Sequence, residues 1–143
     1  MTARGRSLRA AVAQIACRPG DVPANLGLHR DAIAAARQAG ADLLVFPELS
    51  LTDYLAAPDR ERLGMSRSDP RLAGLAREAG PMAVSLGFIE REPGGGSFNS
   101  QALLAHGEVV AVHRKINLPS YGSLSEAAHY TPGRRLDPVV LAG

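Results

Sequence analysis

A run of four apolar residues, from Leu43 to Phe46, constrains the fold of this chain more than any other feature. A short apolar run without polar alternation is typical of a strand buried on both faces, as in a parallel sheet. Pro47 ends the run, and the carboxylate of Glu48 follows at once. Because α/β proteins gather their functional groups at the ends of such strands, Glu48 is the first candidate site residue.

The residues around this strand predict a βαβ unit. Residues 8–16 form a mostly apolar stretch, which we expect to be the first strand. Residues 25–39 are rich in alanine, with apolar side chains near helical spacing, and Gly40 follows where helices commonly end. The second strand spans residues 41–47. Strand, helix and strand in this order favour a parallel sheet and the α/β class.

The rest of the chain predicts one more helix and several strands. Ser68 or Asp69 can cap a helix over residues 68–79, and Gly80 ends it. Residues 50–67 form a loop or an irregular helix. We expect strands over residues 82–90, 98–106 and 108–114, the last two as a hairpin around Gly107, then a long polar loop over 115–133 and a further strand over 136–143.

Composition and charge argue against several classes of partner. The 143 residues suffice for one domain, and the net charge of +2 comes from scattered basic residues, unlike a nucleic-acid interface. No apolar stretch approaches the ~18 residues of a membrane span, and the basic start lacks a signal-peptide cleavage pattern. The single cysteine, Cys17, excludes an internal disulfide and fits a reducing compartment. We therefore expect a cytoplasmic protein without nucleic-acid or membrane partners.

Three weaker patterns have ordinary structural explanations. Residues 83–87, AVSLG, lack the first glycine of a serine-hydrolase nucleophile turn and continue as a strand. The glycines at 94–96 are not followed by the Lys-Ser/Thr pair of a phosphate-binding loop. The four histidines lack the spacing of metal ligands, so we predict no metal and no cofactor.

Lys115 and Glu126 complete a set of three charged residues with Glu48. Lys115 follows the predicted hairpin, and Glu126 lies in the polar loop after it. Each residue alone is more often a solvated surface group. A lysine between two carboxylates stays charged and could stabilise an oxyanion, while a carboxylate beside it could act as a general base.

Taken in order, the motifs resemble those of the nitrilase superfamily, the carbon–nitrogen hydrolases. FPELSLTDY at 46–54 resembles that family's FPEL-x-L-x-GY motif, with Asp53 in place of the usual glycine. Residues 98–119 are similar to its N-S, G and Y-R-K-x-x-L-P pattern, and residues 121–133 to its Y-G-x-F-x-E…Y-x-x-PG segment. With the first strand included, the resemblance covers residues 8–143 and is specific.

The resemblance implies an α-β-β-α sandwich and a Glu-Lys-Cys mechanism without a cofactor. Carried over, Glu48 would be the general base, Lys115 would stabilise the tetrahedral intermediate, and Glu126 would support Lys115. In this family a cysteine attacks an amide or nitrile carbon, and water later hydrolyses the covalent acyl-enzyme.

The nucleophile is the point at which this sequence departs from the family. The cysteine should lie in a strand-to-helix turn beyond the last residues of the chain. Cys17 lies outside the motifs, near the end of the first strand, and is predicted to be structural. We therefore expect residues 1–143 to be the N-terminal part of a single carbon–nitrogen hydrolase domain, an incomplete sandwich that is inactive alone.

Two classes of function stay open. The first is an enzyme, foremost an amidase acting on a small non-peptide amide, with a nitrilase or the glutaminase domain of an NAD synthetase as alternatives. The second is a non-catalytic half-domain that binds an amide ligand or a full-length homologue. A half-sandwich exposes an apolar sheet face and an edge strand, so we expect a homo-oligomer or completion by a C-terminal half.

Overall fold

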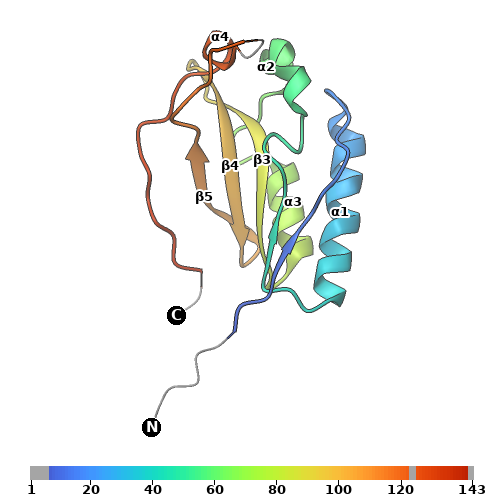
Figure 1. Cartoon of the computed structure of the whole chain (residues 1–143). Coiled ribbons are helices and arrows are strands. Elements are labelled where there is room, and N and C mark those ends of the chain that lie inside the picture. The colour runs from blue at the N-terminus through green and yellow to red at the C-terminus, as the bar shows by residue number, and fades with distance from the viewer. Residues whose placement is uncertain (1–6, 123–124, 142–143) are drawn as a thin grey trace.

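The computed structural model describes residues 7–122 and 125–141, which form one five-stranded sheet with the two long helices on one face (Figure 1). The strand order follows the chain, from β1 to β5. The strands are β1 Ala10–Val12, β2 Leu43–Val45, β3 Ala83–Arg91, β4 Ser97–Ala105 and β5 Glu108–Arg114. The helices are α1 Val22–Gln38, the 3₁₀ helix η1 Tyr54–Asp59, α2 Arg60–Leu63, α3 Pro70–Ala79 and α4 Glu126–His129.

The sheet combines a parallel half with an antiparallel hairpin. β1, β2 and β3 pair in parallel, with Leu44 opposite Ala11 on one side and Val84 on the other. β4 runs antiparallel to both β3 and β5. The carboxyl ends of β1, β2, β3 and β5 therefore meet at one edge of the sheet. The parallel βαβ unit and the hairpin that the sequence predicts are both confirmed.

Both long helices begin at residues whose side chains satisfy a free backbone amide. The Asp21 carboxylate accepts a hydrogen bond from the Ala24 amide at 3.1 Å, and Asp69 accepts one from Arg71 at 2.9 Å. A proline lies in the first turn of each helix, where it does not interrupt the hydrogen-bond pattern. Because Asp21 provides the cap, α1 begins three residues earlier than the sequence pattern predicts.

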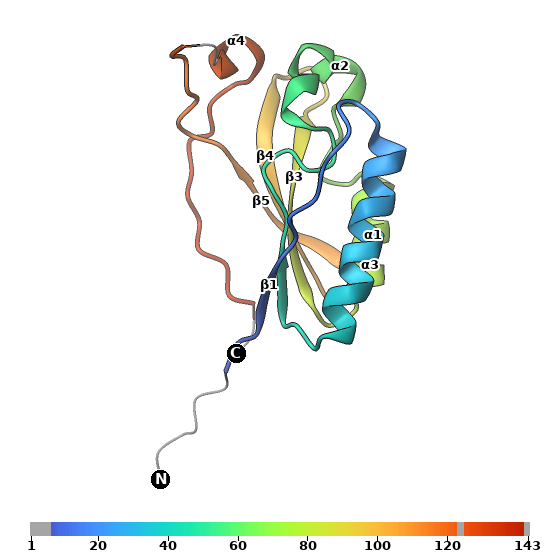
Figure 2. The ribbon, with the colours of Figure 1, turned by 45° about the vertical axis from the view of Figure 1, so that its right-hand side comes forward.

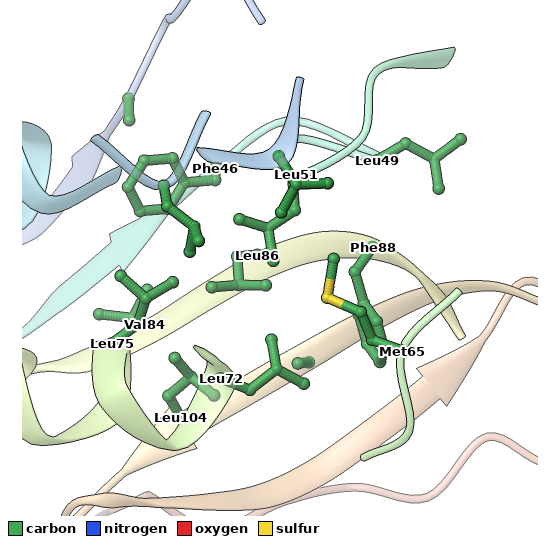
Figure 3. Packing of buried hydrophobic residues seen from close by; sticks show 14 of the residues in the cluster. Phe46, Leu49, Leu51, Met65, Leu72, Leu75, Val84, Leu86, Phe88 and Leu104 are labelled. Atoms are coloured by element: carbon green, nitrogen blue, oxygen red, sulfur yellow. The ribbon is translucent and has the colours of Figure 1, made fainter. Parts of the chain in front are cut away.

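The hydrophobic core lies between the sheet and the two long helices. Leu72 and Leu75 of α3 are fully buried, as are Val84, Leu86 and Phe88, which alternate along β3 and point to the same side (Figure 3). Burial of these side chains fixes the helical layer to one face of the sheet.

The opposite face of the sheet carries only the C-terminal segment in the described part of the chain. Residues 130–141 run along this side as irregular coil, on the side of the sheet away from α1 and α3 (Figure 2). A groove of about 1050 Å³ separates the segment from the sheet, where Ser85, Gln101 and Leu103 line it. Val12 on β1 is 81% exposed. The described residues thus form one helical layer and one sheet.

Three predicted elements differ from the structure. The strand expected over 136–143 is irregular coil in its described part, residues 136–141, because no neighbouring strand is there to pair with it and Pro138 has no amide hydrogen. The loop expected over 115–133 contains α4. The first strand is limited to β1 because only three of its residues pair with β2. No helix among the described residues has the length and apolar character needed to cross a bilayer.

Candidate active site

The structure brings the three predicted residues into direct contact. Lys115 Nζ donates hydrogen bonds to Glu48 Oε1 at 2.8 Å and to Glu126 Oε1 at 3.0 Å. Glu48 follows β2, Lys115 follows β5, and Glu126 opens α4, so three separate segments contribute one side chain each. They meet at the edge where the carboxyl ends of β2 and β5 lie, as expected for a site in an α/β sheet.

The turn that carries Glu48 packs directly against β3. The Phe46 amide donates to Ser85 O at 2.8 Å, and the Leu51 amide donates to Gly87 O at 2.9 Å. Leu49 has a positive φ of 51° in this turn. A Cβ atom added to Gly87 would lie 2.1 Å from the Leu49 nitrogen, so only glycine allows this approach.

A buried histidine contacts the same turn, and it is not among the site residues predicted from the sequence. His29 is 0% exposed and stacks on Phe46 with ring centroids 4.1 Å apart. Its Nδ1 lies 2.7 Å from Asn25 O, and its Nε2 lies 2.9 Å from Ser50 Oγ. Ser50 Oγ in turn accepts a hydrogen bond from the Gly87 amide at 3.2 Å. The i, i+4 spacing of Asn25 and His29 on the apolar face of α1 is the one signal that could have indicated this network.

Lys115 is fixed through its backbone as well as its side chain. Its amide donates to Asn99 O at 2.8 Å, and its carbonyl accepts from the Gly133 amide at 2.8 Å. The Asn99 side chain donates to Glu48 Oε1, the same oxygen that Lys115 contacts. Asn99 on β4 therefore connects the lysine and the first carboxylate.

The electrostatics keep Lys115 protonated. Burial opposes the charge of the ammonium group, but its hydrogen bonds with Glu48 and Glu126 outweigh this and raise the pKa of Lys115. An ammonium group has three donors, and two are used here. Within residues 7–122 and 125–141 the third donor has no acceptor and is available to a ligand. Lys115 is also the only lysine in the sequence, whose other side chains with a permanent positive charge are arginines.

Glu126 is the buried member of the set, with a side chain only 3% exposed, whereas that of Glu48 is 50% exposed. Two tyrosines lie within the influence of this carboxylate. Burial and the negative charge of Glu126 raise the pKa of both Tyr54 and Tyr130, so both stay neutral phenols at neutral pH. Neither tyrosine was predicted from the sequence.

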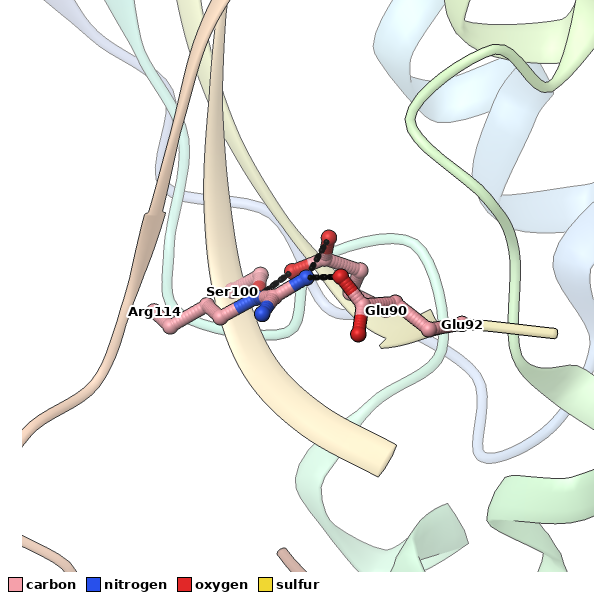
Figure 4. A network of polar contacts seen from close by, with 4 residues as sticks. All are labelled: Glu90, Glu92, Ser100 and Arg114. Atoms are coloured by element: carbon pink, nitrogen blue, oxygen red, sulfur yellow. Dashed lines mark hydrogen bonds and ion pairs between the residues drawn. The ribbon is translucent and has the colours of Figure 1, made fainter. Parts of the chain in front are cut away.

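A second charged cluster supports the residue before Lys115 (Figure 4). Arg114 donates two hydrogen bonds to the buried Glu90 carboxylate at 2.7 Å each and also contacts Glu92. Ser100 Oγ donates to Glu90 at 2.7 Å, and the guanidinium lies 3.8 Å from the centre of the Phe98 ring. This network anchors the end of β5 and hence the start of the segment that carries Lys115.

Cys17 has the properties of a structural thiol. It lies between β1 and α1, partly buried. Burial and the nearby charge of Asp53 raise the pKa of the Cys17 thiol, which disfavours the thiolate that a nucleophile requires.

The chain matches the profile of the carbon–nitrogen hydrolases over residues 9–142. It belongs to the carbon–nitrogen hydrolase family. It is 35% identical over 135 residues to a glutamine-dependent NAD(+) synthetase of Thermotoga maritima, a match that covers 92% of this chain and 23% of that enzyme. It is 28% identical to an N-carbamoylputrescine amidase of Solanum tuberosum, covering 93% of this chain and 46% of the amidase.

Solved structures place the fold in the same family. An amidase from Nesterenkonia sp. superimposes with a TM-score of 0.79 at 33% identity, over 96% of this chain and 52% of the amidase. A glutamine-dependent NAD+ synthetase from Acinetobacter baumannii superimposes with a TM-score of 0.78 at 26% identity, over 91% of this chain and 25% of that enzyme. The chain thus spans less than half the length of these two curated relatives and about half of the amidase with a solved structure.

Proposed function

We propose that residues 1–143 are the N-terminal part of an amidase domain that hydrolyses a small non-peptide amide. Glu48 acts as the general base, Lys115 stabilises the oxyanion of the tetrahedral intermediate, and Glu126 holds Lys115 in place. The observation that carries the proposal is the position of Lys115 Nζ, 2.8 Å from Glu48 and 3.0 Å from Glu126, with a third donor that no described residue occupies. A charged, fixed donor of this kind stabilises negative charge that develops on a carbonyl oxygen.

The nucleophile comes from outside these residues. Solved forms of the Nesterenkonia amidase carry acrylamide, or the acetamide moiety of fluoroacetamide, at an active-site cysteine. In this chain the only cysteine, Cys17, has a raised thiol pKa and no place in the set of three. We therefore expect residues 1–143 to be inactive alone and to require a cysteine from a C-terminal half.

The uncovered sheet face is the surface that such a half would cover. Its groove is lined by Leu103, Val110 and Ala111 on the strands and by the C-terminal segment. A second copy of the chain is the alternative occupant and would give a homo-oligomer. The single cysteine supports a reducing compartment, so we place the protein in the cytoplasm.

The glutaminase domain of an NAD synthetase is the second candidate function. It is favoured by the Thermotoga relative, which at 35% shares more identity with the chain than the Solanum amidase does at 28%. The two functions differ in substrate, because a glutaminase cleaves glutamine whereas the amidase proposed first cleaves a small non-peptide amide.

The test is an assay of the complete gene product that contains these residues. Ammonia release is measured with glutamine, with short aliphatic amides and with the corresponding nitriles. Release from simple amides supports the first proposal, and release from glutamine alone supports the second. Lys115→Met should reduce kcat about 1,000-fold, as does the loss of a donor to an oxyanion. An unreduced rate in this variant contradicts both proposals. A folded product that releases no ammonia from any substrate indicates the non-catalytic half-domain.

A further inference from the structure

The carboxylate of Glu48 is held in an asymmetric way. Its side chain is half exposed, yet two donors reach it, and both reach the same oxygen. Lys115 Nζ donates to Oε1 at 2.8 Å, and Asn99 Nδ2 donates to Oε1 as well. Among the residues that the structure describes, no donor reaches Oε2. The two oxygens of the proposed general base therefore have different roles available to them.

We propose that Asn99 is a positioning residue that, together with Lys115, engages Oε1 of Glu48 and reserves Oε2 for the proton of the nucleophile. This inference rests on the proposed function. A carboxylate held by one donor can rotate and exchange its two oxygens. Two donors, one on β4 and one directly after β5, converge on one oxygen and fix the orientation of the carboxylate. Proton transfer depends on such orientation.

Asn99 is suited to this task by its chemistry and by its place in the sheet. Its side chain carries N–H donors that do not titrate, so the contact persists across the working pH range. The residue is 4% exposed and pairs with Ile89 in the ladder between β3 and β4. Its own carbonyl accepts the Lys115 amide at 2.8 Å. One rigid residue thus sets the positions of both the proposed base and the proposed oxyanion donor.

The reaction step that depends on this arrangement is the formation of the acyl-enzyme. The S–H bond of the incoming cysteine breaks, and its proton moves to Glu48 Oε2. The sulfur forms a bond to the amide carbon, and the electron pair of the C=O bond moves to the oxygen, next to the free donor of Lys115. The proton on Oε2 then moves to the amide nitrogen, the electron pair on the oxygen re-forms the C=O bond, and the C–N bond breaks. Ammonia or an amine leaves, and the acyl group remains on the cysteine as a thioester.

The test compares Asn99→Ala and Asn99→Asp with Gln38→Ala in the complete gene product. Gln38 is a matched control because it also carries a side-chain amide but is exposed at the end of α1, outside the candidate site and the groove. We expect Asn99→Ala to lower kcat about 100-fold, the cost of a misplaced reacting group, with KM little changed. Asn99→Asp should also shift the acid limb of the pH profile to higher pH, because a second carboxylate beside Glu48 disfavours its charged form. The Gln38→Ala rate should stay close to wild type.

A second measurement keeps the inference testable without turnover. The side-chain amide resonances of Asn99 are recorded by NMR in the wild-type protein and in Glu48→Ala. A clear shift of these resonances supports the contact. An unchanged Asn99 amide, or an Asn99→Ala variant as active as Gln38→Ala, overturns the inference. If the wild-type protein hydrolyses no amide, the proposed function fails by itself, and the NMR comparison still decides whether Asn99 holds Glu48.

Discussion

The buried imidazole of His29 makes the stability of the fold depend on pH at the scale of one residue. Burial lowers the pKa of His29 from 6.5 to about 4, because the charged ring would lose its hydration. The folded state therefore favours the neutral ring. This contribution to stability is fully present above pH 6.5 and declines as the pH falls from 6.5 to about 4, by on the order of 3 kcal/mol in total.

The free energy of urea unfolding at pH 7.5, 5.5 and 4.5 checks this prediction. His29→Gln should be less stable than the wild type at pH 7.5 and should lose less stability on acidification. The exposed His113 is the matched control, and His113→Gln should follow the wild-type pH dependence. An identical pH dependence in wild type and His29→Gln would show that His29 does not cause it.

The ammonium of Lys115 reports on both carboxylates of the candidate site. Because hydrogen bonds with Glu48 and Glu126 raise its pKa against the effect of burial, replacing either carboxylate should lower that pKa. The stabilisation by these contacts is present below pH 10.5 and is lost as the pH rises through the raised value. Because Lys115 is the only lysine of the 143 residues, its Nζ gives a single lysine resonance. The pH dependence of this resonance is measured by NMR in the wild-type chain, in Glu48→Gln and in Glu126→Gln. If Lys115 has the same pKa in both variants as in the wild type, its hydrogen bonds with Glu48 and Glu126 are contradicted.

The pair of Glu90 and Arg114 should respond strongly to loss of one partner. Burial opposes the charge of Glu90, but its hydrogen bonds with Arg114 and Ser100 outweigh this and lower the pKa of Glu90. Arg114→Leu leaves that carboxylate buried without its cation, which costs about 3 kcal/mol of unfolding free energy. The control is Arg135→Leu, whose exposed pair with Asp137 should contribute about 0.5 kcal/mol or less. Equal losses in the two variants would contradict the assignment.

At the scale of elements, the close approach of the Glu48 turn to β3 predicts opposite effects of the same substitution at two glycines. Gly87→Ala places a Cβ 2.1 Å from the Leu49 nitrogen and should destabilise the fold by about 2 kcal/mol or more. Gly74→Ala in α3 meets no atom within 4 Å and should stabilise by about 0.5–1 kcal/mol. Thermal unfolding of both variants checks the pair. A tolerated Gly87→Ala would mean that the turn is not held against β3.

Some helices and strands can be recognised in the sequence from their own residues, and others cannot. α3 is capped by Asp69 and ends before Gly80, and both signals are local in the chain. The coil at residues 136–141 was predicted as a strand from its apolar residues, but a strand also needs a neighbour with free backbone groups. α4 has four residues, too few for a helical pattern to be visible in the sequence.

At the scale of the whole molecule, the uncovered sheet face predicts self-association of the 143-residue chain. Leu103, Val110 and Val140 line the groove on this face, and β5 is an edge strand. Apolar surface of this kind beside a free strand edge promotes contact between chains. Leu103→Lys should shift the chain toward monomer in sedimentation velocity, whereas Leu55→Lys, at an exposed site on η1, should not. A monomeric wild-type chain at high concentration would contradict the prediction.

The order of the residues predicts the fold class, the family and the three charged residues of the candidate site. A buried run that ends at Glu48, a hairpin followed by Lys115 and a loop with Glu126 are visible in the order of the residues. Such signals are local, because strand burial, helix caps and turns depend on neighbours in the chain.

The contacts that position these residues are visible only in the folded structure. Asn99 and Glu48 are 51 residues apart, and His29 and Ser50 are 21 apart, so each contact exists only because strands and helices distant in sequence pack side by side. The N-S pattern at Asn99 does not by itself indicate that the Asn99 side-chain amide contacts the Glu48 carboxylate, which lies in the turn after β2. The physical reason is that side-chain hydrogen bonds in a sheet edge depend on register and packing, which the whole fold sets at once.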